Sequence, residues 1–149
     1  MFEIRVCSAA AIEEYVCDVP HALISIRSPG ADRPELPENE KRIGCISLKF
    51  HDIVGSEDKE DLGRKMLAKW NVEPYEFSER HAQKIREFVE AVEEHIEVLY
   101  CQCEAGISRS AGIAAAISKH MTGDDEFFFK NYHPNTLAYR RVLEAFQKK

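Results

Sequence analysis

Hydrophobic and polar residues follow one another along the chain in a pattern that predicts strands and helices in turn. Four short apolar or β-branched runs are typical of strands, at residues 2–7, 22–26, 43–50 and 98–103. The clearest helical pattern covers residues 78–96, where apolar side chains recur at steps of three and four: Ala82, Ile85, Val89, Val92 and Ile96. Strands that alternate with helices favour an α/β domain of three layers, with a central, mostly parallel sheet of about four strands flanked by helices.

The segments between these elements predict further helices and loops. Ser8 is placed to cap a helix over residues 9–16, and the alanines of residues 111–119 favour a helix after the last strand. A C-terminal helix is predicted over residues 137–146, whereas three prolines predict a loop within 27–41. Residues 55–73 have no firm pattern, and two interpretations stay open for them: a partly helical flap near a site, or a loop.

Size and composition fit one soluble globular domain. The chain has 149 residues, of which 44% are hydrophobic and 31% charged, enough for a core within a single domain of residues 1–149. The formal net charge of −6 disfavours broad binding to nucleic acid or to an anionic membrane. No apolar run approaches the length of a membrane span, and the first residues lack a secretory-signal pattern. We therefore expect a cytoplasmic protein, whose oligomeric state the sequence leaves open.

The cysteines form an odd and scattered set without zinc-ribbon spacing: Cys7, Cys17, Cys45, Cys101 and Cys103. Reduced thiols fit this set best, and no histidine stands at a short spacing that would complete a metal site. Cys101 and Cys103 lie two residues apart on a predicted strand, so their side chains share a face. We expect Cys101 to be a core residue, with a redox partnership with Cys103 as the alternative.

The segment with the strongest chemical signal is residues 103–110, Cys-Glu-Ala-Gly-Ile-Ser-Arg-Ser, between a predicted strand and a predicted helix. The first helical turn leaves N–H groups unpaired and carries partial positive charge, so it favours a bound anion. Gly106 lets the backbone curl, and Arg109 supplies a planar charged fork for two phosphate oxygens. The predicted phosphate-binding residues are Glu104, Ala105, Gly106, Ile107, Ser108 and Arg109.

Cys103 at the start of this segment is placed to attack the phosphorus of a bound phosphate. The attack needs a thiolate, and a free thiol with a pKa of ~8.5 is only ~3% ionised at pH 7. The dipole of a helix contributes about 0.3–1 kcal/mol, so Arg109, the loop N–H groups and the Ser110 hydroxyl must supply the rest. The alternative is a buried structural cysteine beside an arginine that caps a loop.

Residues 103–110 resemble the signature of the cysteine-dependent protein tyrosine phosphatases, especially the compact dual-specificity group. That signature is His-Cys, five residues, then Arg and Ser or Thr, and Gln102 stands where the family has histidine. The resemblance implies hydrolysis of phosphate monoesters through a phosphocysteine intermediate, with no metal or cofactor. It also implies that Ser110 stabilises the departing thiolate and that residue 102 supports the loop. A glutamine amide can donate hydrogen bonds there but brings no charge.

Such a reaction needs a second catalytic group, because the leaving oxygen must be protonated. In the resembling family this group is an aspartate on a loop after an earlier strand, and Asp52 matches it by position. Asp58 and Asp61 are alternatives, but we favour Asp52 because a strand end is better fixed than a mid-loop position. Compact members also carry Pro-Asn before the last helix, where the asparagine braces the phosphate loop. Asn135 fits that role, and equally the role of a helix cap.

The side chains of the loop narrow the expected substrate. None of its variable positions is lysine, and Glu104 would repel a polyanionic inositide or an RNA triphosphate. We therefore expect a phosphorylated protein, or a small phosphomonoester, as the substrate. Two alternatives stay open: a pseudophosphatase that binds phosphorylated partners without turnover, and an arsenate reductase or rhodanese-like sulfur transferase that uses a similar loop.

Overall fold

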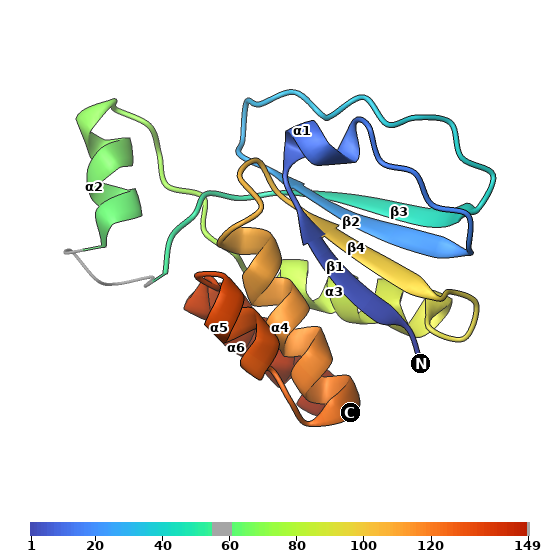
Figure 1. Ribbon diagram of the computed structural model, residues 1–149. Helices are drawn as coiled ribbons and strands as arrows, with labels where there is room; N and C mark the ends of the chain where they lie inside the picture. Colours follow the sequence, from blue (N-terminus) through green and yellow to red (C-terminus); the bar gives the residue numbers. More distant parts are fainter. Residues whose placement is uncertain (55–60, 149) are drawn as a thin grey trace.

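A central parallel sheet organises the molecule (Figure 1). The computed structural model describes residues 1–54 and 61–148 of the chain. Its sheet has four strands in the order β1-β4-β2-β3, and every pairing is parallel. The strands are β1 (Glu3–Cys7), β2 (His21–Arg27), β3 (Arg42–Lys49) and β4 (Val98–Gln102). The central strands β2 and β4 are almost wholly buried, which explains their continuous apolar sequences.

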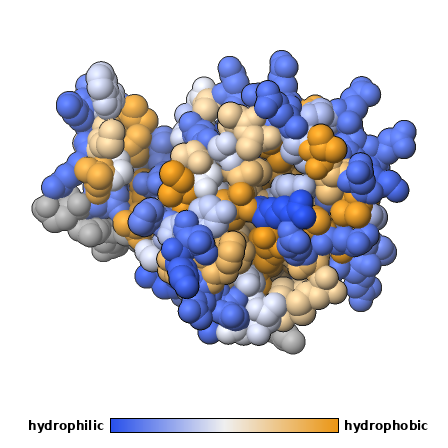
Figure 2. Space-filling view, viewed as in Figure 1, coloured by the Kyte–Doolittle hydropathy of each residue, from blue (hydrophilic) through white to orange (hydrophobic). Residues whose placement is uncertain are grey.

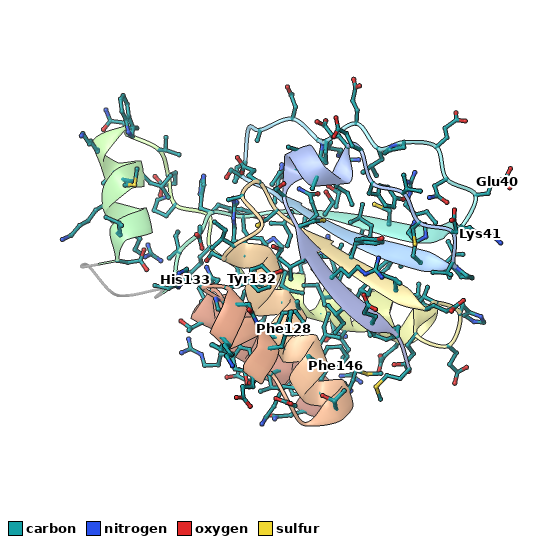
Figure 3. The ribbon with its side chains drawn as sticks, in the orientation of Figure 1. Glu40, Lys41, Phe128, Tyr132, His133 and Phe146 are labelled. Carbon is teal, nitrogen blue, oxygen red and sulfur yellow. The ribbon has the colours of Figure 1, made fainter. Side chains whose placement is uncertain are left out.

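Helices and a long loop cover the two faces of the sheet. On one face lie α3 (Glu79–Val92), α4 (Arg109–Thr122), α5 (Glu126–Asn131) and α6 (Thr136–Gln147). Phe128 and Phe146 belong to this helical layer and are buried in the larger core cluster (Figure 3). The short helix α1 (Ala9–Ile12) lies on the other face, where Ile12 packs with Leu23 and Tyr100. The predicted three-layer α/β architecture is confirmed.

Several boundaries differ from the sequence prediction for identifiable reasons. Ser8 caps α1 as expected, but the helix ends at Ile12, and Tyr15 turns inward to hydrogen-bond His21 at 2.8 Å. Helix α3 begins at the Ser78 capping box but ends at Val92 rather than at residue 96. Helix α5 was not predicted, because three successive phenylalanines at 127–129 show no helical period, and only Phe128 is buried.

The region that lacked a firm pattern contains one helix, α2 (Leu62–Lys69). This helix projects from the body of the molecule beyond the carboxyl ends of the strands (Figure 1). Residues 55–73 are therefore partly helical, in agreement with the first of the two interpretations given above. In the described part of the chain, each helix is too short or too polar to cross a lipid bilayer.

Candidate active site

Cys103 follows directly after β4, at the carboxyl edge of the sheet, and is only 2% exposed. Its Sγ atom accepts a hydrogen bond from the Gly106 N–H at 3.2 Å and lies 3.1 Å from Ser110 Oγ. Both the amide and the hydroxyl can donate to a thiolate at that position. The loop therefore turns back on the sulfur atom and surrounds it with donors.

Gly106 is required by backbone geometry and by space. Its φ angle is +70°, which L-residues rarely adopt, and a Cβ there would lie 2.6–2.9 Å from backbone atoms of Cys7 and Ser8. The same connection between β1 and α1 binds the loop through hydrogen bonds from Cys103 N to Cys7 O and from Ala9 N to Glu104 O. The end of β1 thus fixes the curvature of the loop.

Several backbone amides of the loop are open to a ligand. The N–H groups of Glu104, Ala105, Ile107 and Ser108 donate to no acceptor in the described parts of the chain. They precede the first turn of α4, where the helix dipole adds partial positive charge. Such an arrangement can bind a tetrahedral anion without a metal.

Arg109 is the first residue of α4 and is largely buried. Its Nη1 donates to the Phe50 carbonyl at 2.8 Å and to Ser28 Oγ at 3.0 Å, and its Nη2 donates to Glu104 at 3.1 Å. A guanidinium has five N–H groups. The Nε–H and one Nη2 hydrogen therefore have no acceptor among residues 1–54 and 61–148, and this pair of donors suits two phosphate oxygens.

The Glu104 carboxylate forms an ion pair with Arg109 instead of being an isolated charge at the edge of the site. Its Oε1 accepts from Ser28 Oγ at 2.6 Å, from Ser28 N at 2.9 Å and from the guanidinium. The Ser28 hydrogen bonds and the Arg109 charge hold the pKa of Glu104 below its ordinary value. Sequence reasoning missed Ser28, although its place directly after β2 was a usable signal, since ligands gather at the carboxyl ends of parallel strands.

Asp52 lies beside the loop and is exposed to solvent. Its Oδ1 accepts from Ser108 Oγ at 2.9 Å and from Asn135 Nδ2 at 2.7 Å. Among the competing aspartates, Asp58 lies outside the described residues. Asp61 is buried at the N-cap of α2, where its carboxylate accepts from Arg64 N at 3.1 Å and Val54 N at 2.9 Å.

Asn135 combines the two roles that the sequence left open. Its side-chain oxygen caps α6 by accepting from Ala138 N at 2.9 Å, and its own N–H donates to the Ser108 carbonyl at 2.9 Å. Its Nδ2 donates to Asp52 and to the Ile53 carbonyl at 3.1 Å. A single buried asparagine therefore contacts the phosphate loop, the candidate acid and the last helix.

Two polar residues next to the site have defined partners. Gln102 is buried, and its Oε1 accepts from Ser25 Oγ at 2.5 Å across β2 and β4. His51 accepts from Tyr75 N at 3.0 Å through Nδ1, so the neutral ring carries its proton on Nε2. Burial and the nearby Arg109 lower the pKa of His51. Within the described ranges, no three His, Cys, Asp or Glu side chains gather as metal ligands do.

Comparison with known proteins supports the fold. No protein-family model matches the chain, and no curated protein sequence is similar to it. The solved structure of PTPMT1 in complex with PI(5)P is similar with a TM-score of 0.50 and 12% identity, over 86% of this chain and 77% of that one. The human tyrosine phosphatase-like serine/threonine/tyrosine-interacting protein gives 0.49 at 18% identity, over 85% of this chain and 75% of that one. The structure of DUSP15 has a TM-score of 0.45 and 16% identity, over 87% of this chain and 71% of that one.

The likeness to PTPMT1 extends over most of both chains and concerns the fold alone. The protein has the compact α/β fold of the dual-specificity-like cysteine phosphatases. The predicted resemblance is confirmed at this level.

Proposed function

We propose that the protein hydrolyses phosphate monoesters through a phosphocysteine intermediate and acts on phosphorylated tyrosine, serine or threonine in proteins. One arrangement carries this proposal. Loop amides and two Arg109 donors that have no acceptor among residues 1–54 and 61–148 belong to the same loop as a buried cysteine, and an exposed carboxylate is hydrogen-bonded to that loop. Reduced thiols throughout the chain fit a cytoplasmic location for this activity.

In the first step, the Cys103 thiolate forms a bond to phosphorus as the bond from phosphorus to the leaving oxygen breaks. The loop amides and the Arg109 fork hold the three non-bridging oxygens, where negative charge must be stabilised. Asp52 donates its proton to the leaving oxygen, which departs as an alcohol or a phenol.

In the second step, Asp52 accepts a proton from water, whose oxygen forms a new bond to phosphorus. The bond from sulfur to phosphorus breaks, and Cys103 leaves as a thiolate. The Ser110 hydroxyl, 3.1 Å from Sγ, stabilises that thiolate by donating a hydrogen bond. The Glu104 carboxylate, the Ser28 hydroxyl and the Phe50 carbonyl act as positioning groups, because they hold the Arg109 guanidinium rather than the phosphate.

The charge of the site favours substrates with a single phosphate group. Glu104 offsets part of the Arg109 charge, and the loop contains no lysine. A phosphoinositide, the class of ligand in the PTPMT1 structure, would bring at least one further phosphate, its diester group, toward this carboxylate. Phosphorylated proteins and small monoesters therefore fit the site better than phosphoinositides.

A second candidate function is binding of phosphorylated partners without turnover. Gln102 favours it, since its amide accepts from Ser25 and brings no positive charge to the neighbourhood of the nucleophile. This function would keep the phosphate cradle but not the reactivity of Cys103.

Turnover of an aryl phosphate in the presence of EDTA, measured alongside phosphopeptide affinity, separates the two functions. Hydrolysis that is lost in Cys103→Ser, with phosphopeptide affinity retained, supports the phosphatase. Phosphopeptide binding without turnover by the wild-type protein supports the binding function. Hydrolysis that survives Cys103→Ser contradicts the proposed mechanism.

A further inference from the structure

Helix α2 is anchored beside the candidate acid by its first turn. A Cβ on Gly63 would lie 2.3 Å from the Asp52 carbonyl oxygen, so the helix backbone packs directly on that residue. The buried Asp61 carboxylate accepts from Val54 N, and Arg64 forms an ion pair with Glu76 at 3.0 Å. The position of α2 is therefore tied to the segment that carries Asp52.

The face that α2 presents beyond this anchor is apolar and exposed. Leu62, Met66 and Trp70 recur at steps of four residues, so they lie along one side of the helix. Their side chains are 72%, 56% and 72% exposed. Hydrophobic side chains are visible on the projecting α2 lobe in Figure 2.

A groove of about 320 Å³ joins this face to the candidate active site. It is lined by Asp52, Val54, Asp61, Leu62, Gly63 and Met66. Asp52 belongs to both the groove and the phosphate site, because its carboxylate also accepts from Ser108 of the loop. A group in the groove therefore contacts the same residue that the proposed mechanism uses as the acid.

We infer that this groove, if the proposed phosphatase function holds, binds an apolar side chain next to the phosphorylated residue of a peptide substrate. A peptide continues on both sides of its phosphorylated residue, so it can place a neighbouring side chain over Leu62 and Met66 while the phosphate occupies the loop. A small aryl phosphate has no such extension. The exposed Trp70 extends the apolar surface by a further helical turn for the next peptide residue.

Two phosphotyrosine peptides test this subsite: one with leucine on both sides of the phosphotyrosine, the other with serine in the same places. We expect the wild-type protein to favour the leucine peptide about tenfold in kcat/KM, as expected for partial burial of a leucine side chain. Met66→Gln should bring the ratio of the two peptides close to one. The matched control, Ala68→Gln, changes another exposed position of the same helix and should leave the ratio near tenfold.

Trp70 supplies an independent readout, because it is the only tryptophan of the chain. In Cys103→Ser, which binds without turnover, the leucine peptide should change Trp70 fluorescence at about tenfold lower concentration than the serine peptide. Vesicles of phosphatidylcholine and phosphatidylserine should leave the emission unchanged.

Equal turnover of the two peptides by the wild-type protein would overturn the inference, as would a leucine preference that survives Met66→Gln. An emission shift with vesicles and none with peptides would overturn it in favour of a lipid surface. If the wild-type protein turns over neither the peptides nor an aryl phosphate, the proposed function fails separately. In that case the groove is tested by the Trp70 titration alone: it binds an apolar side chain if the leucine peptide changes the fluorescence at a lower concentration than the serine peptide, and it does not if the two concentrations are equal.

Discussion

The loop that carries Cys103 and the segment that carries Asp52 meet at one edge of the sheet but are held there by different means. Cys103 is buried, and its contacts to Gly106 and Ser110 come from the same short stretch of chain. Asp52 is exposed, and its carboxylate is held by Ser108 and Asn135, which lie 56 and 83 residues further along. The side-chain contacts of the Cys103 sulfur are thus local, although the end of β1 also holds the loop backbone, whereas both contacts of the Asp52 carboxylate come from distant segments.

This difference implies that substitutions affect the two regions unequally. A change that distorts the loop moves the Cys103 sulfur, the loop amides and Arg109 together, because all of them belong to the single segment of residues 103–109. A change around Asp52 moves only the proton donor, so its effect should depend on how much the leaving group needs a proton.

The largest effect is expected for Gly106→Ala. The added Cβ would meet backbone atoms of Cys7 and Ser8 at 2.6–2.9 Å, so the loop must shift and the phosphate-binding amides with it. We expect kcat/KM for an aryl phosphate to fall about 10³-fold. Gly30→Ala is the matched control, since Gly30 also has a positive φ, of +89°, but open space around its Cβ position. Similar activity in the two variants would show that loop curvature is not critical.

Asp52→Asn should lower kcat about 10²-fold for phenyl phosphate and far less for an aryl phosphate with an acidic phenol, which leaves without protonation. Asp61→Asn is the comparison variant, because Asp61 caps α2 and should affect unfolding rather than the leaving-group dependence. The assignment of Asp52 is wrong if the loss is equal for both substrates, or if Asp61→Asn shows the leaving-group effect instead.

Asn135→Asp tests the long-range support of the acid. The variant keeps an oxygen to cap α6 but removes the donor to Asp52 and brings a second carboxylate near it. We expect kcat for phenyl phosphate to fall about tenfold, and the free energy of unfolding to fall by about 1–3 kcal/mol, because the buried carboxylate would face Asp52 and the Ile53 carbonyl. Asn135→Ala loses the cap and both donors without adding a charge, so its kcat separates the loss of the donor from the added charge. Unchanged turnover in Asn135→Asp would remove Asn135 from the positioning of Asp52.

The smallest effect is expected at Glu104. Its pKa is lowered in the folded protein, so its carboxylate stabilises the fold above its unfolded pKa, and this contribution is lost as the pH falls through the folded pKa. Because the side chain is about half exposed, Glu104→Gln should cost less than about 1 kcal/mol at pH 7. The difference from wild type in urea denaturation should shrink as the pH falls below the ordinary pKa of glutamate, while Glu14→Gln, an exposed control, shows none at pH 7. A difference that grows on acidification would contradict the assigned ion pair.

The same contrast explains what the sequence could predict. The strand before Cys103, the glycine at the curl and the arginine at the helix start lie within one short segment, so local patterns sufficed to predict the loop geometry. The four-stranded parallel sheet followed from apolar runs of strand length. Asp52 could be placed at a strand end, but its hydrogen bonds to Ser108 and Asn135 depend on tertiary packing.

Two contacts of the site depend on the tertiary structure. Ser28 binds Arg109 and Glu104 because β2 and β4 are neighbours in the sheet. The order of the strands cannot be predicted from the sequence of any one strand. Glu104 is predicted to repel a polyanionic inositide or an RNA triphosphate, and the structure adds that its carboxylate is paired with Arg109. The exposed apolar face of α2 was not identified from the sequence, because residues 55–73 taken together have no firm pattern.

The central claim is that Cys103 carries the phosphoryl group during turnover. Rapid acid quenching of the wild-type protein with a radiolabelled aryl phosphate, followed by peptide mapping, tests it directly. The label should appear on the peptide that contains Cys103, at up to one phosphoryl group per chain, and disappear in Cys103→Ser. Steady turnover with no label on that peptide, or label on any other residue, would contradict the mechanism.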